Sequence, residues 1–425
     1  MNEPSGLSRR GLLAGAGALV AGASLAGCEN TTTPVATAEG TSGKGIMGDE
    51  TAGGPVDAAG IPLARRDYPV TLPKIGDPVK AGSPEKGGEL QVYNYADYLN
   101  PEVIQAFGKQ EGVSVRVTTF QSLDEAFTKL STGRLKFDVI FTAPDHLPRL
   151  VGRRLIQPLN FDLVPNLVKE AWPELHSPFY DVGPRYTVPY TLYTTGIGWR
   201  NDQIGSLDPN ELGWETFWKA QALRGKVAVL DDSREALGLA LMRRGITNLN
   251  TEDQGLLDRA SADLQELNDL VRVKVAINGY ETLPAGRMTL NQVWSGDMLN
   301  AVISYLPEGT SGDVLSYWFQ RAGGPVFNDC ICVGVDAAKP VMAHRFLNYL
   351  LQPDVALKNF VEYVGYQPPI TKIDADALFE QQVLPENLRT CVVTREDYAN
   401  GNAYLALTAD GRRRWDQAWG AFRNG

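Results

Sequence analysis

The sequence predicts an α/β protein whose strands lie mostly in parallel sheets. From residue 87 onward, short apolar strands alternate with amphipathic helices, as is typical of this fold class. Residues 89–107 show the repeating unit most clearly, with apolar and polar residues alternating as in a strand and then an apolar helical face. Between the two, Asn100 precedes Pro101, which fits an N-cap followed by proline at the first helical position.

The first 27 residues have the features of an export signal. Ser8-Arg9-Arg10 is typical of a twin-arginine signal, and the apolar run over 12–26 suits a signal peptide but is too short to span a bilayer. Leu25-Ala26-Gly27-Cys28 resembles a bacterial lipobox, which predicts cleavage before Cys28 and lipid on its sulfur. An uncleaved membrane anchor is the less favoured alternative. We therefore expect an exported lipoprotein.

Residues 28–86 are predicted to form a flexible tether. Their first half is rich in Thr, Gly, Ala and Pro and has no apolar period. From residue 61 prolines are scattered among a few hydrophobic residues, which we expect along the domain surface.

The remaining elements are expected in turn along the chain. Two helices have capping-box starts, at Ser122 and Thr251, and a third is expected to end at Gly245. Strands are expected over 113–117, 137–142, 186–190, 195–199, 226–230, 299–305 and 326–333, and the later helices over 343–351, 355–364 and 412–422.

Composition and motifs exclude several classes of function. The chain has 425 residues, enough for two or three domains, and a formal net charge of −10, which makes nucleic acid an improbable partner. Nucleophile-elbow, phosphate-loop, dinucleotide and zinc-protease motifs are absent from the sequence, so no cofactor is predicted. The histidines (His146, His176, His344) lack ligand spacing, so no metal site is predicted.

Three cysteines remain after Cys28. Export makes a disulfide possible, and it would join Cys391 to Cys330 or to Cys332. Because the side chains of Cys330 and Cys332 would point to the same side of a strand, either could reach Cys391, and the choice stays open.

Aromatic rings next to carboxylates recur at strand ends, where open α/β sheets bind ligands. Such clusters suit an organic cation, because rings offer cation–π faces and acids neutralise charge. Asp232 and Glu235 have the spacing of a helix-capping box, and that structural role is the simpler explanation for them. The other clusters are Tyr95-Ala-Asp97-Tyr98, Trp294-Ser-Gly-Asp297, Phe327-Asn-Asp329 and Tyr366-Gln367.

Several segments together resemble the spermidine/putrescine-binding proteins of bacterial ABC importers. The resemblance covers residues 87–369, and its most specific parts are DDSRE at 231–235 and LLQPDVA followed by VGYQPP. It implies a type II periplasmic-binding-protein-like fold, with two α/β lobes joined by strands that cross near Thr194, Phe327 and residue 372. One lobe would comprise 87–193 and 327–372, the other 194–326 and 373–425.

The resemblance also implies ligand-binding residues. Tyr95 and Phe327 stand where the family has tryptophans, and Ala143-Pro144-Asp145 replaces a Ser-x-Tyr lining pair. The positions matched to cargo-binding residues are Tyr95, Asp97, Tyr98, Asp232, Glu235, Trp294, Asp297, Phe327, Asp329 and Tyr366.

We therefore predict a binding protein that captures a polyamine in the cleft between its lobes and delivers it to an ABC permease, without catalysing a reaction. Carboxylates would hold the ammonium groups, and the rings would hold the methylene chain. Three alternatives remain: a cleft adapted to another organic cation, an amino-sugar or ferric ion; a hydrolase or lyase using Asp97 and Asp329 as acid and base; and an adhesin or sensor module.

Overall fold

The computed structural model describes residues 54–424. The predicted signal peptide, Cys28 and the first part of the predicted tether lie outside these residues. Within the described part of the chain, no helix combines the length and apolar character that crossing a membrane requires.

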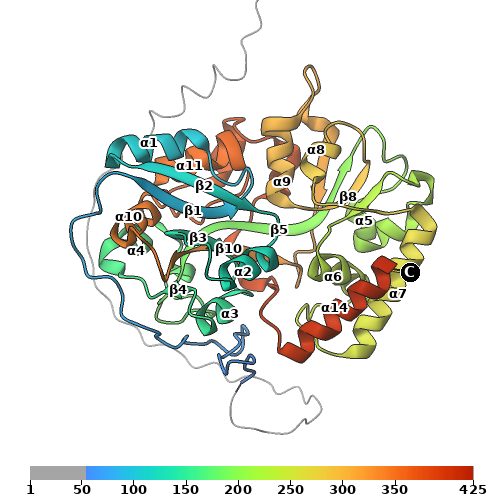
Figure 1. Ribbon diagram of the computed structural model, residues 1–425. Helices are drawn as coiled ribbons and strands as arrows, with labels where there is room; N and C mark the ends of the chain where they lie inside the picture. The colour runs from blue at the N-terminus through green and yellow to red at the C-terminus, as the bar shows by residue number, and fades with distance from the viewer. Residues whose placement is uncertain (1–53, 425) are drawn as a thin grey trace, which may run out of the picture. The chain divides into compact units, whose positions relative to one another are not determined.

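Two sheets, joined through one long strand, form the centre of the protein (Figure 1). Strand β5 (Val188–Arg200) bonds to β10 as far as Thr194 and to β8 from Thr195 onward, so it passes from one sheet to the other at that point. We call the two halves lobe 1 and lobe 2. Lobe 1 contains β1 (Glu89–Tyr95), β2 (Ser114–Phe120), β3 (Val139–Thr142), β4 (Ile156–Gln157) and β10 (Val326–Gly334). Lobe 2 contains β6 (Val227–Val229), β7 (Lys274–Val275), β8 (Leu290–Trp294) and β9 (Leu315–Trp318).

The pairing directions distinguish the crossing strands from the rest. The runs β2-β1-β3 and β8-β6-β7 are parallel, whereas every pair that includes β5 or β10 is antiparallel. The predicted α/β fold with parallel sheets and crossing strands is confirmed. The two extended segments expected over 186–190 and 195–199 are parts of the single strand β5.

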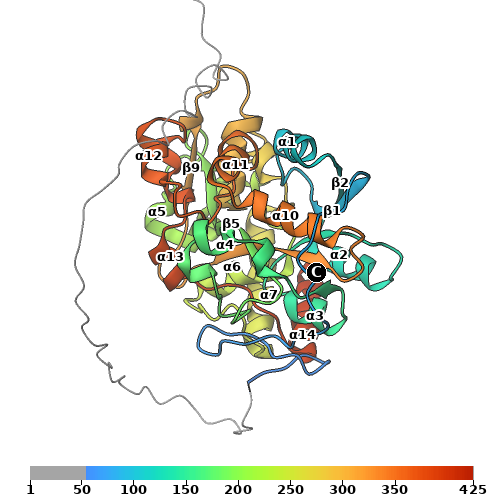
Figure 2. The same ribbon diagram turned by 90° about the vertical axis from the view of Figure 1, so that its left-hand side faces the viewer.

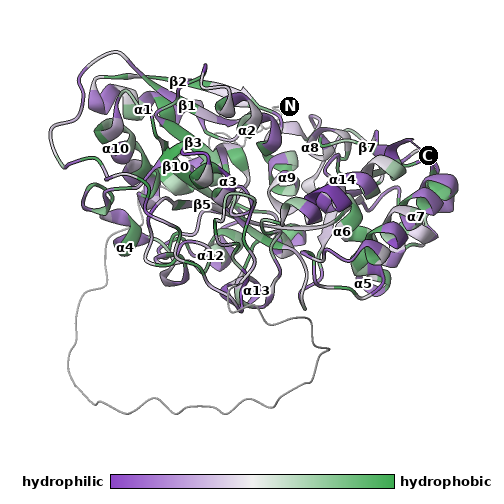
Figure 3. Ribbon diagram, turned by 60° about the horizontal axis from the view of Figure 1, so that its bottom comes forward, coloured by the Kyte–Doolittle hydropathy of each residue, from purple (hydrophilic) through white to green (hydrophobic). Residues whose placement is uncertain are grey.

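Helices cover the sheets of both lobes. Lobe 1 carries α1 (Pro101–Glu111), α2 (Leu123–Ser131), α3 (Leu147–Gly152), α4 (Asn166–Glu170), α10 (Pro340–Leu350) and α11 (Pro353–Asn359). The later helices are α5 (Pro209–Leu212), α6 (Ser233–Arg243), α7 (Gln254–Val271), α8 (Gly279–Thr282), α9 (Ser295–Asn300), α12 (Ala375–Glu380), α13 (Arg395–Asn400) and α14 (Ala409–Asn424). Figure 3 shows hydrophobic residues at β3 and β10 inside lobe 1 and hydrophilic ones along α7 and α14 at the outside of lobe 2.

Two of the predicted caps form as the sequence indicates, whereas the helix expected to start at Thr251 is capped by Asp253, whose side chain accepts from the N–H of Leu256. The side chain of Asn100 accepts a hydrogen bond from the backbone N–H of Glu102. Ser122 accepts one from the N–H of Glu125, whose carboxylate in turn accepts from the N–H of Gln121. These contacts satisfy N–H groups that the first turn of a helix otherwise leaves unpaired.

The prediction of a strand over 299–305 is wrong. This segment instead completes α9 and continues as a π-helix over Ala301–Tyr305. A short apolar run cannot distinguish a strand from a buried helix, and here Leu299 and Ala301 are buried on a helix that packs against β5.

The expected disulfide is also wrong. Cys330 and Cys332 are buried in the core of lobe 1, whereas Cys391 is buried in a separate core of lobe 2, and all three are free. The fold packs Cys391 against a different set of side chains from those around Cys330 and Cys332, so the pairing expected from the sequence does not form.

Residues 55–86, which we call the strap, pack against the folded domain. The second half of the segment predicted as a flexible tether is therefore held in place. Val70 and Leu72 are buried in the core of lobe 1, and the hydroxyl of Tyr186 donates to the carbonyl of Pro73 over 2.7 Å. The strap also reaches the beginning of α14, where the guanidinium of Arg65 donates to the carbonyl of Ala406 over 3.0 Å (Figure 2). The apolar residues of the strap form neither a helix nor a strand, and each packs separately against residues of lobe 1. Periodicity in the sequence therefore does not reveal them.

Truncating a buried strap residue should therefore destabilise the protein. We expect Leu72→Ala to cost about 2–5 kcal/mol of unfolding free energy, because it leaves a cavity in the core of lobe 1. Urea unfolding of the variant and its parent measures this difference. Val56→Ala is the control within the same segment, since Val56 is 50% exposed. If both variants unfold like the parent, the strap does not pack as described.

Candidate functional site: a cavity between the lobes

A cavity of about 150 Å³ lies between the two lobes. Its walls come from the β1–α1 loop, β5 and β10 on one side and from β8, α8 and α9 on the other. Of the ten predicted binding residues, those that line it are Tyr95, Asp97, Tyr98, Trp294, Asp297, Asp329 and Tyr366. Further lining residues are Ala96, Phe120, Gln121, Tyr193, Ile277, Tyr280, Asn300 and Val364.

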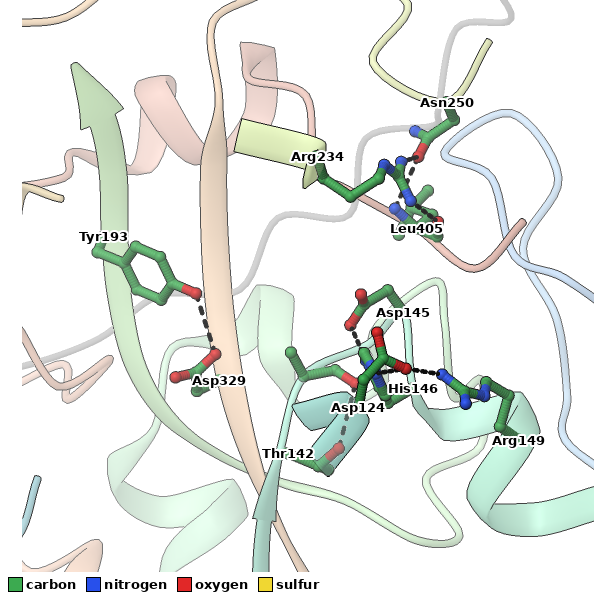
Figure 4. A network of polar contacts seen from close by, with 11 residues as sticks. Asp124, Thr142, Asp145, His146, Arg149, Tyr193, Arg234, Asn250, Asp329 and Leu405 are labelled. Atoms are coloured by element: carbon green, nitrogen blue, oxygen red, sulfur yellow. Dashed lines mark hydrogen bonds and ion pairs between the residues drawn. The ribbon is translucent and has the colours of Figure 1, made fainter. Parts of the chain in front are cut away.

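Asp329 is the buried carboxylate that lobe 1 contributes to the cavity. The hydroxyl of Tyr98 donates to its Oδ2 over 2.8 Å. The hydroxyl of Tyr193 donates to its Oδ1 over 3.2 Å (Figure 4). The register of β10 against β5 shifts between Asp329 and Cys330, a bulge of the kind that re-aims a side chain. Burial raises the pKa of Asp329 to about 7, against the opposing effect of the two tyrosine hydrogen bonds.

Asp297 is the corresponding carboxylate of lobe 2. It lies in the first turn of α9 with only 5% of its surface exposed, and the hydroxyl of Tyr366 donates to its Oδ1 over 2.8 Å. Its Oδ2 has no hydrogen-bond partner among the described residues. Burial raises the pKa of Asp297 to about 7. The Tyr366 ring lies directly on Gly296, where a Cβ would approach it to 2.3 Å, so a side chain at position 296 would displace this ring.

Asp97 is exposed, in contrast to these two acids. It adopts a φ of 52° in the loop after β1, a left-handed conformation that aspartate tolerates better than most residues. The hydroxyl of Tyr363 donates to its Oδ1 over 3.2 Å. Asp97 therefore places a solvated negative charge at the edge of the cavity.

Aromatic rings form the wall of the cavity between the acids. The ring of Tyr98 lies 5.6 Å from that of Tyr95 and 5.0 Å from that of Tyr366, both edge to face. Tyr193 continues the wall at 5.4 Å from Tyr366. Edge-to-face packing leaves ring faces available to a cation or a methylene chain.

Glu235 does not line the cavity but supports a residue that does. It is 4% exposed, and its Oε1 accepts hydrogen bonds from the indole N–H of Trp294 over 2.8 Å and from the hydroxyl of Thr195 over 2.9 Å. The Tyr404 hydroxyl donates to its Oε2 over 3.3 Å. Burial, and secondarily the charge of Asp232, raises the pKa of Glu235 to about 8. The hydrogen bonds from Thr195 and Tyr404 fix the carboxylate of Glu235, and Glu235 in turn fixes the orientation of the Trp294 ring. Glu235 is therefore a positioning residue.

The two other predicted residues also lie outside the cavity. Asp232 caps α6, with its Oδ1 accepting from the backbone N–H groups of Arg234 and Glu235, and its side chain is open to solvent. Phe327 lies behind the wall, with its ring centroid 5.3 Å from that of Tyr193 and 5.0 Å from that of Tyr404.

Sequence reasoning missed Tyr193, Tyr280 and Asn300. Tyr193 was detectable, because it directly precedes Thr194, where the crossing was expected. Asn300 lies three residues after Asp297, the spacing of one helix face, but the strand expected over 299–305 concealed that relationship. No sequence signal indicated Tyr280.

Charged groups form a separate network where Ala143-Pro144-Asp145 replaces the Ser-x-Tyr pair (Figure 4). The Nδ1 atom of His146 lies 2.9 Å from a carboxylate oxygen of Asp145. Burial alone would lower the pKa of His146, but Asp145 and Asp124 outweigh it and raise this pKa to about 9. On lobe 2, Arg234 donates to the side chain of Asn250 over 2.8 Å. None of these groups lines the cavity.

The fold and the cavity define a class of protein. Two α/β lobes that share crossing strands, with an aromatic cavity between them, are the architecture of a periplasmic-type solute-binding protein. Residues 102–386, more than half of the chain, match the family described as bacterial extracellular solute-binding protein. The chain belongs to this family, whose members bind solutes and are not enzymes.

Proteins of known name and solved structures are similar to this chain. The spermidine/putrescine-binding periplasmic protein of Escherichia coli (strain K12) is 26% identical over 293 residues, which are 68% of this chain and 80% of that protein. The putrescine/agmatine-binding protein of Pseudomonas aeruginosa is 29% identical over 287 residues, 65% of this chain and 77% of that protein. The solved putative spermidine/putrescine ABC transporter from Listeria monocytogenes has a TM-score of 0.66 at 24% identity and covers 79% of this chain and 98% of its own. The last likeness supports the two-lobed fold alone.

Proposed function

We propose that this protein captures a polyamine of the putrescine/spermidine class in the interlobe cavity and delivers it to an ABC permease. The observation that carries the proposal is the presence of two buried carboxylates, Asp297 and Asp329, contributed by opposite lobes to one aromatic cavity. No lysine or arginine is among the described residues that line this cavity.

The charge balance favours a cationic cargo. A buried carboxylate is costly unless a cation or several donors neutralise it, and burial has already raised the pKa of Asp297 and of Asp329 to about 7. Two ammonium groups joined by methylenes would supply both charges at once. The methylene chain would lie against rings such as Tyr98 and Tyr366.

The two-lobed arrangement also accounts for release. A cargo that bridges Asp329 of lobe 1 and Asp297 of lobe 2 favours the closed form of the protein, because only closure brings both acids to one molecule. Without cargo, the cost of burying two carboxylates that no cation neutralises favours opening, which returns them to water. A permease that stabilises the open form would thereby discharge the cargo.

We further propose that the protein is exported through the twin-arginine route and held at the membrane by lipid on Cys28. The support is the order of the N-terminal signals, namely the arginine pair, the apolar run and the lipobox-like Leu25-Ala26-Gly27-Cys28. Relatives named as periplasmic binding proteins are consistent with this location.

Calorimetric titration with putrescine, spermidine, spermine and 1-aminobutane tests the cargo class. We expect one site that binds the di- and polyamines, and binding of 1-aminobutane at least 100-fold weaker, since it leaves one buried carboxylate without a cation (about 3–5 kcal/mol). Absence of binding by every amine would contradict the proposed function.

A further inference from the structure

Helix α9 carries, on two residues that line the cavity, two buried acceptor atoms without a hydrogen-bond partner among the described residues. They are Oδ2 of Asp297 and Oδ1 of Asn300, and both side chains line the cavity. The two residues are only 5% and 7% exposed, respectively. Residues three apart on a helix lie on one face, so the two side chains stand next to each other on the cavity side of α9.

Orphan acceptors of this kind point to a ligand. A buried acceptor without a donor costs about 1–3 kcal/mol, and more when it is charged, so a pair of them is unfavourable in the empty protein. A primary ammonium carries three N–H donors and one positive charge. It would satisfy the carboxylate through charge and a hydrogen bond, and the amide oxygen through a second hydrogen bond.

The acid in lobe 1 is surrounded differently. Both oxygens of Asp329 already accept tyrosine hydroxyls, from Tyr98 and Tyr193, whereas Tyr366 occupies only one oxygen of Asp297. The two ends of the cavity are therefore not equivalent. The α9 end has more acceptor capacity left for N–H donors than the β10 end.

We propose that Asn300 is a specificity-determining residue, which together with Asp297 forms the binding site for one terminal primary ammonium of the cargo. This inference rests on the proposed function, because it assigns one amine of that cargo to α9. Asp329 then receives an amine at the other end, in a site already rich in donors.

The first test replaces Asn300 and measures putrescine binding by the full chain. We expect Asn300→Ala to weaken binding about 10- to 100-fold, the range for losing one hydrogen bond to a charged group. Asn300→Leu, which keeps the volume of the side chain, should show a similar loss without leaving a void. The melting temperature without ligand verifies that both variants fold.

Asn291 provides a matched control. It is 2% exposed, its Oδ1 is likewise without a partner among the described residues, and it lies on β8 outside the lining of the cavity. Asn291→Ala should leave putrescine affinity within about 2-fold of the parent, because only the loss of an acceptor that touches the cargo weakens binding.

A double-mutant cycle locates the amine that Asn300 serves. If Asn300 and Asp297 hold the same ammonium, Asn300→Ala should cost much less in an Asp297→Asn background than in the parent. In an Asp329→Asn background the two losses should add, because that residue holds the opposite amine. Equal putrescine affinity of the Asn300 variants and the parent, or full additivity with Asp297→Asn, would overturn the inference. A parent that binds no amine would instead refute the proposed function, so the two failures are distinguishable.

Discussion

Lowering the pH from 8 to 6 should weaken putrescine binding by about 100-fold. Burial raises the pKa of both Asp297 and Asp329 to about 7, and the cargo binds their ionised forms. Affinity therefore approaches its maximum about one unit above pH 7 and falls about tenfold per pH unit for each carboxylate well below pH 7. The amines resemble the lysine ammonium, with a pKa of about 10, and remain charged throughout this range.

Two measurements separate this mechanism from a general effect of pH. Calorimetry at pH 7 in buffers of different ionisation enthalpy should show the release of roughly one proton on binding, about half from each acid. Asp297→Asn should reduce the pH dependence to about tenfold over the same interval, since one titrating acid remains. Carboxylates with an ordinary pKa near 4 would give a flat affinity between pH 8 and 6. That flat profile is the result that contradicts capture by buried acids.

The residues of the β1–α1 loop were predictable because local sequence determines their position. A strand, a turn and a capped helix place Tyr95, Asp97 and Tyr98 at the carboxyl end of a strand, which is a general ligand site in α/β sheets. The spacing of Trp294 and Asp297 likewise places both side chains at one strand end, and both line the cavity.

Glu235 illustrates what local sequence cannot determine. The capping pattern was half correct, because Asp232 accepts the backbone N–H groups of α6. The side chain of Glu235 instead turns toward Trp294 and Tyr404, which are 59 and 169 residues away along the chain. Its role depends on which distant donors the fold brings near, and no pattern within one helix contains that information.

Phe327 shows the same limit within one strand. Residues i and i+2 of a strand share a face, so Phe327 and Asp329 were expected in the cavity together. Only Asp329 lines it, because the ring of Tyr404 from the C-terminal segment stacks on Phe327 from behind the wall. The packing of the strap escaped prediction for a related reason, since the core residues that Val70 and Leu72 contact belong to lobe 1.

Asp329→Asn should abolish tight binding and at the same time stabilise the protein without cargo. Removing one partner of a buried ion pair costs about 3–5 kcal/mol, so we expect putrescine affinity to fall by more than 100-fold at about 1.4 kcal/mol per tenfold. In the empty protein, however, Asp329 is a buried carboxylate whose pKa is raised from 3.8 to about 7. A group with a raised pKa contributes stability below its unfolded pKa and loses that contribution as the pH rises through the folded value.

The effect of Asp329→Asn on stability should consequently depend on pH. At pH 5.5 the acid of the parent is protonated in the folded state but ionised in the unfolded state, so part of the cost is already present and the variant should be more stable by a small margin. At pH 8.5 the parent bears a buried charge, and the variant should be more stable by about 1–3 kcal/mol. This gain is smaller than the pKa shift alone implies, because the amide of the variant has one acceptor oxygen instead of two for the hydroxyls of Tyr98 and Tyr193. Thermal unfolding at the two pH values without amine measures the difference. A variant that is less stable than its parent at both pH values would mean that Asp329 serves the fold. An advantage of the variant that grows from pH 5.5 to pH 8.5 would instead identify an acid whose burial is unfavourable until a cation binds.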